Sequence, residues 1–171
     1  MRSLAASILA ELDRRGETLA SAESLTGGMV GQLLTDVPGA SASYLGGVIS
    51  YATRLKTTLA GVDATTLAEL GPVAPRTAAE MARGVAMRCN ADWGLATTGV
   101  AGPEAQAGHP VGQVFVAVSH QANSVLRVNE LSLHGERGAI RQQAAVAALT
   151  LLAETLGLND SDLGADDASI T

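Results

Sequence analysis

The sequence predicts an α/β protein, a three-layer α/β/α sandwich around a mixed, mostly parallel sheet of about five or six strands. Short apolar segments alternate with helix-like segments along the chain, which is typical of layered α/β folds. The last two predicted strands, residues 113–119 and 126–133, are too close in sequence for a crossover, so one strand is expected to be antiparallel. The 171 residues, 47% of them apolar, suffice for the core of one domain.

The first predicted helix covers residues 3–15, because leucine and isoleucine recur there at helical spacing and Gly16 can end it. The short apolar segment 18–22 is predicted as a strand. Residues 27–35 again show helical spacing and form the second predicted helix. Ser24 therefore lies in the connection between the first strand and the second helix.

The middle of the chain continues the alternation of strands and helices. Residues 44–51 are predicted as a strand with valine and isoleucine near its centre. A short helix over 65–70 is ended by Gly71-Pro72. A longer helix is predicted over 75–90, with Pro75 in the first turn, where proline is tolerated.

The last part of the chain supplies three strands and a helix. Residues 93–98 read as a buried strand, followed by a glycine- and proline-rich loop over 99–112. Residues 113–119 and 126–133 are expected to be adjacent strands. The alanine-rich segment 139–156 is predicted as the final helix.

We expect one domain over residues 1–158 and an acidic tail without stable structure over 159–171. The net charge is −6, and four acids fall in the tail, so the remainder carries about −2. A nearly neutral body has no basic stripe to release counterions from phosphates. Aromatic residues make up 2% of the chain, too few for a base-stacking platform. Direct nucleic-acid binding is therefore not expected.

Other composition features narrow the class further. Cys89 is the single cysteine and the three histidines show no ligand spacing, so neither an internal disulfide nor a metal site is expected. The acids Glu11 and Asp13 interrupt the first apolar pattern, which argues against a signal peptide. No apolar run is long enough to span a bilayer. We expect a cytoplasmic, soluble protein.

Lys56 is the only lysine in the chain, while ten arginines carry the other side-chain positive charge. The pKa of a lysine falls readily on desolvation, whereas arginine stays protonated, so only lysine can act as a general base. A serine or threonine hydroxyl would be its natural partner. The count alone leaves two interpretations open, a general base and a surface residue.

Ser24-Leu25-Thr26-Gly27-Gly28 is the segment that could supply this hydroxyl. It joins a predicted strand to a predicted helix, and ligands of open α/β sheets bind at the carboxyl ends of strands. The free N–H groups of a helix start favour an anion there. Helix capping by Ser24 or Thr26 explains the same residues without catalysis. The segment matches neither a Walker A loop nor a G-x-S-x-G elbow.

Three further features of the sequence could be components of the site. The segment Thr97–Pro103 is a second transition from strand to loop, and a tight turn explains it equally. Tyr51 could be an ordinary strand aromatic or part of the site. Arg137 and Arg141 lie one helical turn apart and either bind a phosphate or face solvent.

Together these segments resemble the CinA C-terminal domain family, which also occurs free-standing as nicotinamide mononucleotide deamidase (PncC). The resemblance covers the chain from about Leu4 to Leu156. The motif Gly135-Glu136-Arg137 followed by Arg141 is similar to the family's Gly-Asp-Arg and a later arginine. The stretches that carry the resemblance are Ala22–Gly28, Thr35–Ser41 with Gly46–Val48, Ser50–Ala52 with Lys56, and Thr98–Pro103 with Pro110–Gly112.

The resemblance implies an amidohydrolase of pyridine nucleotide salvage that converts nicotinamide mononucleotide to nicotinate mononucleotide and ammonia. The family's serine nucleophile falls on Ser24, its tyrosine on Tyr51 and its lysine on Lys56. The resemblance implies no metal and no cofactor, a nucleotide as the small-molecule partner, a homodimer or higher homo-oligomer, and the three-layer sandwich. Backbone N–H groups at residues 26–28 are expected to stabilise the oxyanion. The expected substrate-binding residues are Thr26, Gly27, Gly28, Thr98, Gly99, Ala101, Gly102 and Arg141.

The chain departs from the family pattern at Leu25, Val73-Ala74-Pro75, Glu104–Ala107 and Gln113. None of these positions is a proposed catalytic residue, so the departures concern the pocket rim and substrate preference. No second, nucleotide-pyrophosphatase-like domain is present in the sequence, which predicts the stand-alone form. Two alternatives stay open: a partner-binding module of a competence or DNA-damage response, and an amidase acting on another nucleotide amide.

Overall fold

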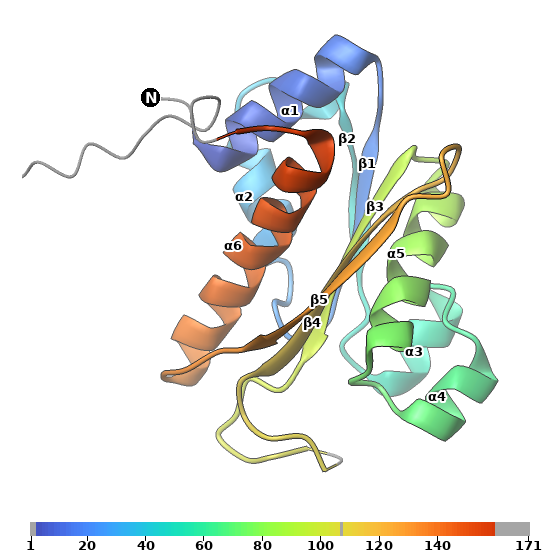
Figure 1. The fold of residues 1–171 in the computed structure, drawn as a ribbon, viewed down its shortest axis with the longest axis vertical. Helices are drawn as coiled ribbons and strands as arrows, with labels where there is room; N and C mark the ends of the chain where they lie inside the picture. Colours follow the sequence, from blue (N-terminus) through green and yellow to red (C-terminus); the bar gives the residue numbers. More distant parts are fainter. Residues whose placement is uncertain (1–2, 107, 160–171) are drawn as a thin grey trace, which may run out of the picture.

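The structure, a computed structural model, describes residues 3–106 and 108–159, so all but the first residue of the tail predicted at 159–171 lies outside the described residues. Five strands form one sheet in the order β2-β1-β3-β4-β5 (Figure 1). The strands are β1 (Leu19–Glu23), β2 (Tyr44–Ile49), β3 (Trp93–Gly99), β4 (Gln113–His120) and β5 (Leu126–Ser132). The helices are α1 (Leu4–Arg15), α2 (Met29–Thr35), η1 (Ala40–Ala42, a 3-10 helix), α3 (Thr53–Thr58), α4 (Ala64–Leu70), α5 (Pro75–Cys89) and α6 (Arg137–Leu156).

The sheet is mixed, as predicted. β1 pairs in parallel with β2 and β3, whereas β4 runs antiparallel to both of its neighbours, β3 and β5. β4 is thus the antiparallel strand, which the tight connection between β4 and β5 requires. The other four strands run in one direction, so the prediction of a mostly parallel sheet is confirmed.

Helices cover both faces of the sheet and complete the predicted three layers. Helices α1, α2 and α6 lie on one face, and α5 lies on the other with α3 and α4 beside it (Figure 1). The alternation of side chains along β4 reflects this arrangement: Val114, Val116 and Val118 join the core under α6, whereas Phe115 and Ala117 join the core under α5. Two separate apolar cores therefore hold the sheet from both sides.

Close packing of α5 on the sheet depends on glycine at one point. A Cβ at Gly94 of β3 would lie 1.9 Å from the carbonyl oxygen of Ala82 in α5. Any side chain there would push the helix away from the sheet. The backbones of α5 and β3 can therefore pack closely at this point, without a large side chain between them.

Two short helices were not predicted, α3 and η1. In α3 the only buried side chain is that of Lys56, so the segment has no apolar periodicity that could indicate a helix. The predicted helix over 27–35 begins at Met29, because residues 24–28 form turns. The predicted final helix over 139–156 begins earlier, at Arg137. Arg137 therefore belongs to the first turn of α6, with consequences for the site.

The parallel strands set the position of the site. β1 ends at Glu23 and β3 at Gly99, and because the strands are parallel both ends lie at one edge of the sheet. β2 ends beside them at Ile49. Segments that are distant in sequence, around Ser24, Ser50 and Val100, consequently meet at this edge. None of the described helices combines the length and apolarity needed to cross a membrane.

Candidate active site

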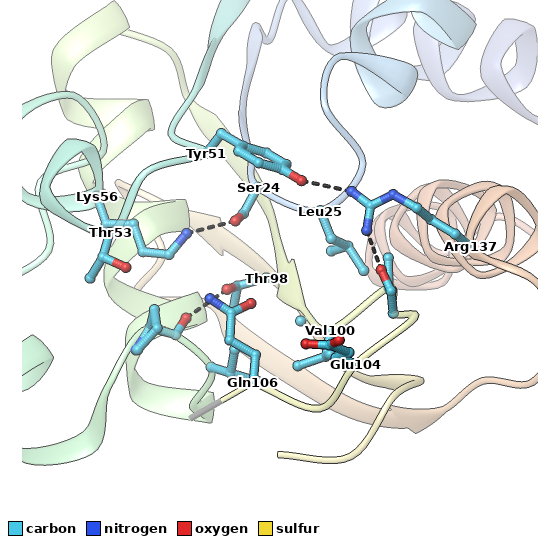
Figure 2. A pocket seen from close by; sticks show the side chains of 15 residues that line it. Ser24, Leu25, Tyr51, Thr53, Lys56, Thr98, Val100, Glu104, Gln106 and Arg137 are labelled. Atoms are coloured by element: carbon cyan, nitrogen blue, oxygen red, sulfur yellow. Dashed lines mark hydrogen bonds between the residues drawn. The ribbon is translucent and has the colours of Figure 1, made fainter. Parts of the chain in front are cut away.

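A cleft of about 110 Å3 opens at the carboxyl ends of β1 and β3 (Figure 2). It is smaller than the pockets that enclose whole drug-sized molecules, which measure about 300–1,000 Å3. The cleft is formed by the segment after β1, the segment after β2 with α3, the loop after β3, and the start of α6. The lining residues are Ser24, Leu25, Tyr51, Thr53, Lys56, Pro72, Val73, Thr98, Gly99, Val100, Ala101, Gly102, Glu104, Gln106 and Arg137.

Ser24 and Lys56 meet in this cleft. The Nζ atom of Lys56 donates a hydrogen bond to the Oγ atom of Ser24 over 2.7 Å (Figure 2). Ser24 is 8% exposed and Lys56 is 1% exposed, so the pair is shielded from bulk water except through the cleft. A hydroxyl in hydrogen-bond contact with a buried amine is the arrangement of a nucleophile and its base.

Backbone pairing beyond the strand ends holds the two residues in place. The N–H of Ser24 donates to the carbonyl of Thr97 over 3.0 Å, which extends the pairing of β1 with β3. The N–H of Ser50 donates to the carbonyl of Glu23 over 2.8 Å, which extends the pairing of β1 with β2. The carbonyl of Ser50 in turn accepts from Lys56 Nζ over 3.1 Å. The lysine is therefore directed at Ser24 by the end of the neighbouring strand.

Burial changes the protonation of Lys56. Desolvation lowers the pKa of its ammonium group from 10.5 to about 8, because the charged form loses its hydration inside the protein. No carboxylate forms an ion pair with Lys56 among the described residues to oppose this effect. A substantial neutral fraction is thus present near pH 8, as a general base requires.

The backbone N–H groups of Gly27 and Gly28, which were predicted to stabilise an oxyanion, have acceptors within the protein. The carboxylate of Glu23 accepts from the backbone N–H groups of Gly28 (2.9 Å), Val30 (3.1 Å) and Gly31 (2.8 Å), so the start of α2 already holds an anion of the protein itself. The N–H of Gly27 donates to the carbonyl of Ser24 over 3.1 Å. Intramolecular acceptors therefore use the N–H groups of both Gly27 and Gly28, which leaves neither donor free for an oxyanion in this structure.

Leu25 offers a donor instead. Within residues 3–106 and 108–159, no acceptor is recorded for its backbone N–H. Leu25 lines the cleft and directly follows Ser24 in sequence. The N–H after a serine nucleophile is a common oxyanion donor in hydrolases.

Thr26 and Arg141 support the loop and do not line the cleft. Thr26 is fully buried, and its hydroxyl lies 2.7 Å from that of Thr97. The guanidinium of Arg141 donates to the carbonyls of Leu25 and Thr26, each over 2.9 Å. Their side chains therefore hold the segment that carries Ser24, and a contact of either residue with substrate stays a prediction.

Arg137, and not Arg141, is the arginine that lines the cleft. It lines the cleft and donates to the hydroxyl of Tyr51 over 2.7 Å and to the carbonyl of Gly102 (Figure 2). Tyr51 is 59% exposed and lies at the rim of the cleft. Its recorded partner is Arg137, whereas Ser24 pairs directly with Lys56. Tyr51 therefore does not bridge Lys56 and Ser24 in this structure.

The loop after β3 supplies the opposite wall. The predicted residues Thr98, Gly99, Ala101 and Gly102 all line the cleft. The Thr98 hydroxyl donates to the carbonyl of Pro72 over 2.6 Å, which ties β3 to the start of the α5 region. Sequence reasoning did not assign a function to two polar lining residues of this loop, Glu104 and Gln106, although the departure from the family pattern had marked their positions.

Within residues 3–106 and 108–159, no group of three or more histidine, cysteine, aspartate or glutamate residues could hold a metal ion.

Comparison with known proteins gives one consistent match. A family model described as the CinA C-terminal domain matches residues 1–156. A CinA-like protein from Frankia casuarinae is 48% identical over 162 residues, which are 94% of this chain and 37% of the relative. A putative competence-damage inducible protein from Halothermothrix orenii is 45% identical over 131 residues, which are 76% of this chain and 32% of the relative. The chain thus spans about a third of the length of these relatives.

Solved structures agree with the sequence comparison. A competence/damage inducible protein from Agrobacterium tumefaciens has a TM-score of 0.85 at 33% identity and covers 90% of this chain and 93% of its own. A competence-damaged protein (CinA) superfamily protein from Klebsiella pneumoniae has a TM-score of 0.85 at 30% identity, covering 90% and 96%. The names of these proteins state no reaction.

Proposed function

Because the chain belongs to the CinA C-terminal domain family, we propose that it hydrolyses the carboxamide of nicotinamide mononucleotide to the carboxylate and ammonia, with Ser24 as nucleophile and Lys56 as base. The single observation that carries the proposal is the 2.7 Å contact between the Ser24 hydroxyl and the buried amine of Lys56. A surface lysine would have neither this partner nor a lowered pKa. The substrate follows from the family resemblance.

The first half of the proposed reaction forms an acyl-enzyme. Neutral Lys56 accepts the proton of Ser24 as Oγ attacks the carboxamide carbon. The backbone N–H of Leu25 donates to the oxyanion, and one such donor contributes about 3 kcal/mol to transition-state stability. The protonated lysine then gives its proton to the leaving nitrogen, so that ammonia departs and the acyl group stays on Ser24.

The second half restores the enzyme. Water enters the position that ammonia has left, and Lys56 accepts one of its protons as the water oxygen attacks the acyl carbon. The carbon–oxygen bond to Ser24 breaks, and the protonated lysine returns a proton to Oγ. The balance is one amide and one water consumed, and one carboxylic acid and one ammonia formed.

The direct test is ammonia release by the purified chain. Nicotinamide mononucleotide is expected to be hydrolysed with a kcat/KM at least about 100-fold above that of free nicotinamide, because phosphate binding energy positions the carboxamide. NAD is tested as a third candidate substrate, and the ammonia released from each of the three compounds is measured. If no ammonia is released from nicotinamide mononucleotide, the proposed function is refuted. If nicotinamide mononucleotide and nicotinamide are hydrolysed with equal kcat/KM, only the proposed recognition of the phosphate is refuted.

Arg137 is proposed to bind the substrate phosphate, since its guanidinium lies at the rim of the cleft beside Tyr51. We expect Arg137→Ala to raise KM for nicotinamide mononucleotide about tenfold or more, a loss typical of a charge-assisted hydrogen bond, with a smaller change in kcat. Arg83→Ala removes an exposed arginine outside this cleft and is the matched control. Steady-state kinetics of both variants decide the assignment, and equal effects of the two substitutions contradict it.

A further inference from the structure

Glu104 places a negative charge in the cleft without a protein partner. It is the only carboxylate among the described residues that line the cleft. No hydrogen bond or ion pair of Glu104 is recorded within the described part of the chain. In Figure 2 its carboxylate lies on the wall opposite the pair of Ser24 and Lys56. A ligand in the cleft therefore meets a carboxylate that has no hydrogen-bond or ion-pair partner among the described residues.

The two cations that line the cleft, Arg137 and Lys56, form their hydrogen bonds with other groups. Arg137 donates to Tyr51 and to the carbonyl of Gly102. Lys56 donates to Ser24 and to the carbonyl of Ser50, and it must be neutral when it acts as a base. Neither cation forms an ion pair with Glu104 among the described residues, so a cationic ligand in the cleft can be the direct partner of this carboxylate.

The wall that carries Glu104 is anchored at both ends. The N–H of Gln106 donates to the carbonyl of His109 over 3.1 Å, and the N–H of His109 donates back over 2.9 Å. The N–H of Val100 donates to the carbonyl of Gln113 over 3.0 Å, at the end of β3. These backbone bonds hold the loop segment from which the exposed side chain of Glu104 extends.

We propose that Glu104 makes the site selective for carboxamides carried on a cationic ring, of which the N-alkylated pyridinium is the relevant class, over neutral aromatic amides of the same shape. The inference rests on the proposed function. A pyridinium bears its charge in the ring, so a carboxylate on the cleft wall attracts it before and during reaction. The same carboxylate repels the carboxylate product, which favours product release.

The experiment compares the binding of two small amides of equal shape, the cation 1-methylnicotinamide and the neutral 3-methylbenzamide. Dissociation constants are measured by NMR titration in the Ser24→Ala background, so that neither amide is consumed. Glu104→Gln removes the charge and keeps the shape. Glu69→Gln removes the same charge from an exposed position of α4 and is the matched control. Thermal melting checks that both variants are folded.

We expect the background protein to prefer the cation, and Glu104→Gln to reduce that preference about fivefold, the effect of a partly exposed ion pair. The reduction should shrink at 1 M salt, because screening acts on charge and not on shape. A preference unchanged in Glu104→Gln, or equally reduced in Glu69→Gln, overturns the inference. Because binding is measured without turnover, this failure is distinct from a failure to release ammonia, which would refute the proposed function.

Discussion

Lys56→Arg is expected to lower kcat for amide hydrolysis about 1,000-fold, almost as much as Lys56→Ala, because general-base catalysis contributes factors of this size. Both side chains are cations, so a lysine that only neutralised charge would be replaced by arginine with little loss. A guanidinium stays protonated at any pH the fold tolerates and cannot accept the proton of Ser24. Ammonia release from nicotinamide mononucleotide by the purified variants gives the comparison.

Lys56→Met is the control for this substitution, because the lysine site is 1% exposed and a guanidinium is larger than an ammonium. Methionine has a similar length and no charge. The folded-state pKa of about 8 lies below the ordinary 10.5, so below pH 8 the folded protein holds a buried charge. Between pH 8 and 10.5 the unfolded chain binds more protons, and wild-type stability gains from rising pH.

Lys56→Met should accordingly be inactive. Below pH 8 it should be at least as stable as the wild type, and its stability should not rise between pH 8 and 10.5 as that of the wild type does. An arginine or methionine variant that retains activity within tenfold of the wild type would show that Lys56 is not the base.

Ser24→Ala is expected to lower kcat by about 10,000-fold or more, since the removal of a serine nucleophile has effects of this order in other hydrolases. Stability should change little, by about 1 kcal/mol, because Lys56 keeps its bond to the carbonyl of Ser50. Ser132→Ala removes a hydroxyl from the exposed edge of β5 and is the matched control. Stopped assays and thermal melts of both variants test the expectation. Activity within tenfold of the wild type means that another nucleophile, or water directly, attacks the amide.

The order of the long elements could be read from the sequence because local patterns determine them. Apolar spacing indicates α1, α5 and α6, and the tight connection between β4 and β5 requires the antiparallel pair. The pairing of Ser24 with Lys56 could be predicted for a chemical reason, since a sole lysine and a hydroxyl after a strand suggest a base and its nucleophile. Helix α3 could not be predicted from apolar spacing, because its one buried residue, Lys56, is polar.

The rest of the site depends on side-chain direction, which spacing does not determine. Arg137 and Arg141 lie one turn apart on α6, yet Arg137 reaches the cleft and Arg141 holds the loop of Ser24. The N–H groups at the start of α2 were expected to bind an anion of the ligand. In the structure the carboxylate of Glu23, five residues before Gly28, accepts from them. Both differences follow from contacts between distant segments.

The pH dependence of kcat/KM for nicotinamide mononucleotide tests the central claim most directly, because it reports the ionisation of the free enzyme's base. Measurement from pH 6.5 to 9.5 stays above about 6, where the substrate phosphate titrates. With the pKa of Lys56 lowered to about 8 by burial, the neutral base increases as pH rises. We predict a rate that rises with pH and levels off above about 8. A profile that is flat across this range, or that falls with rising pH, would contradict a Ser24–Lys56 mechanism.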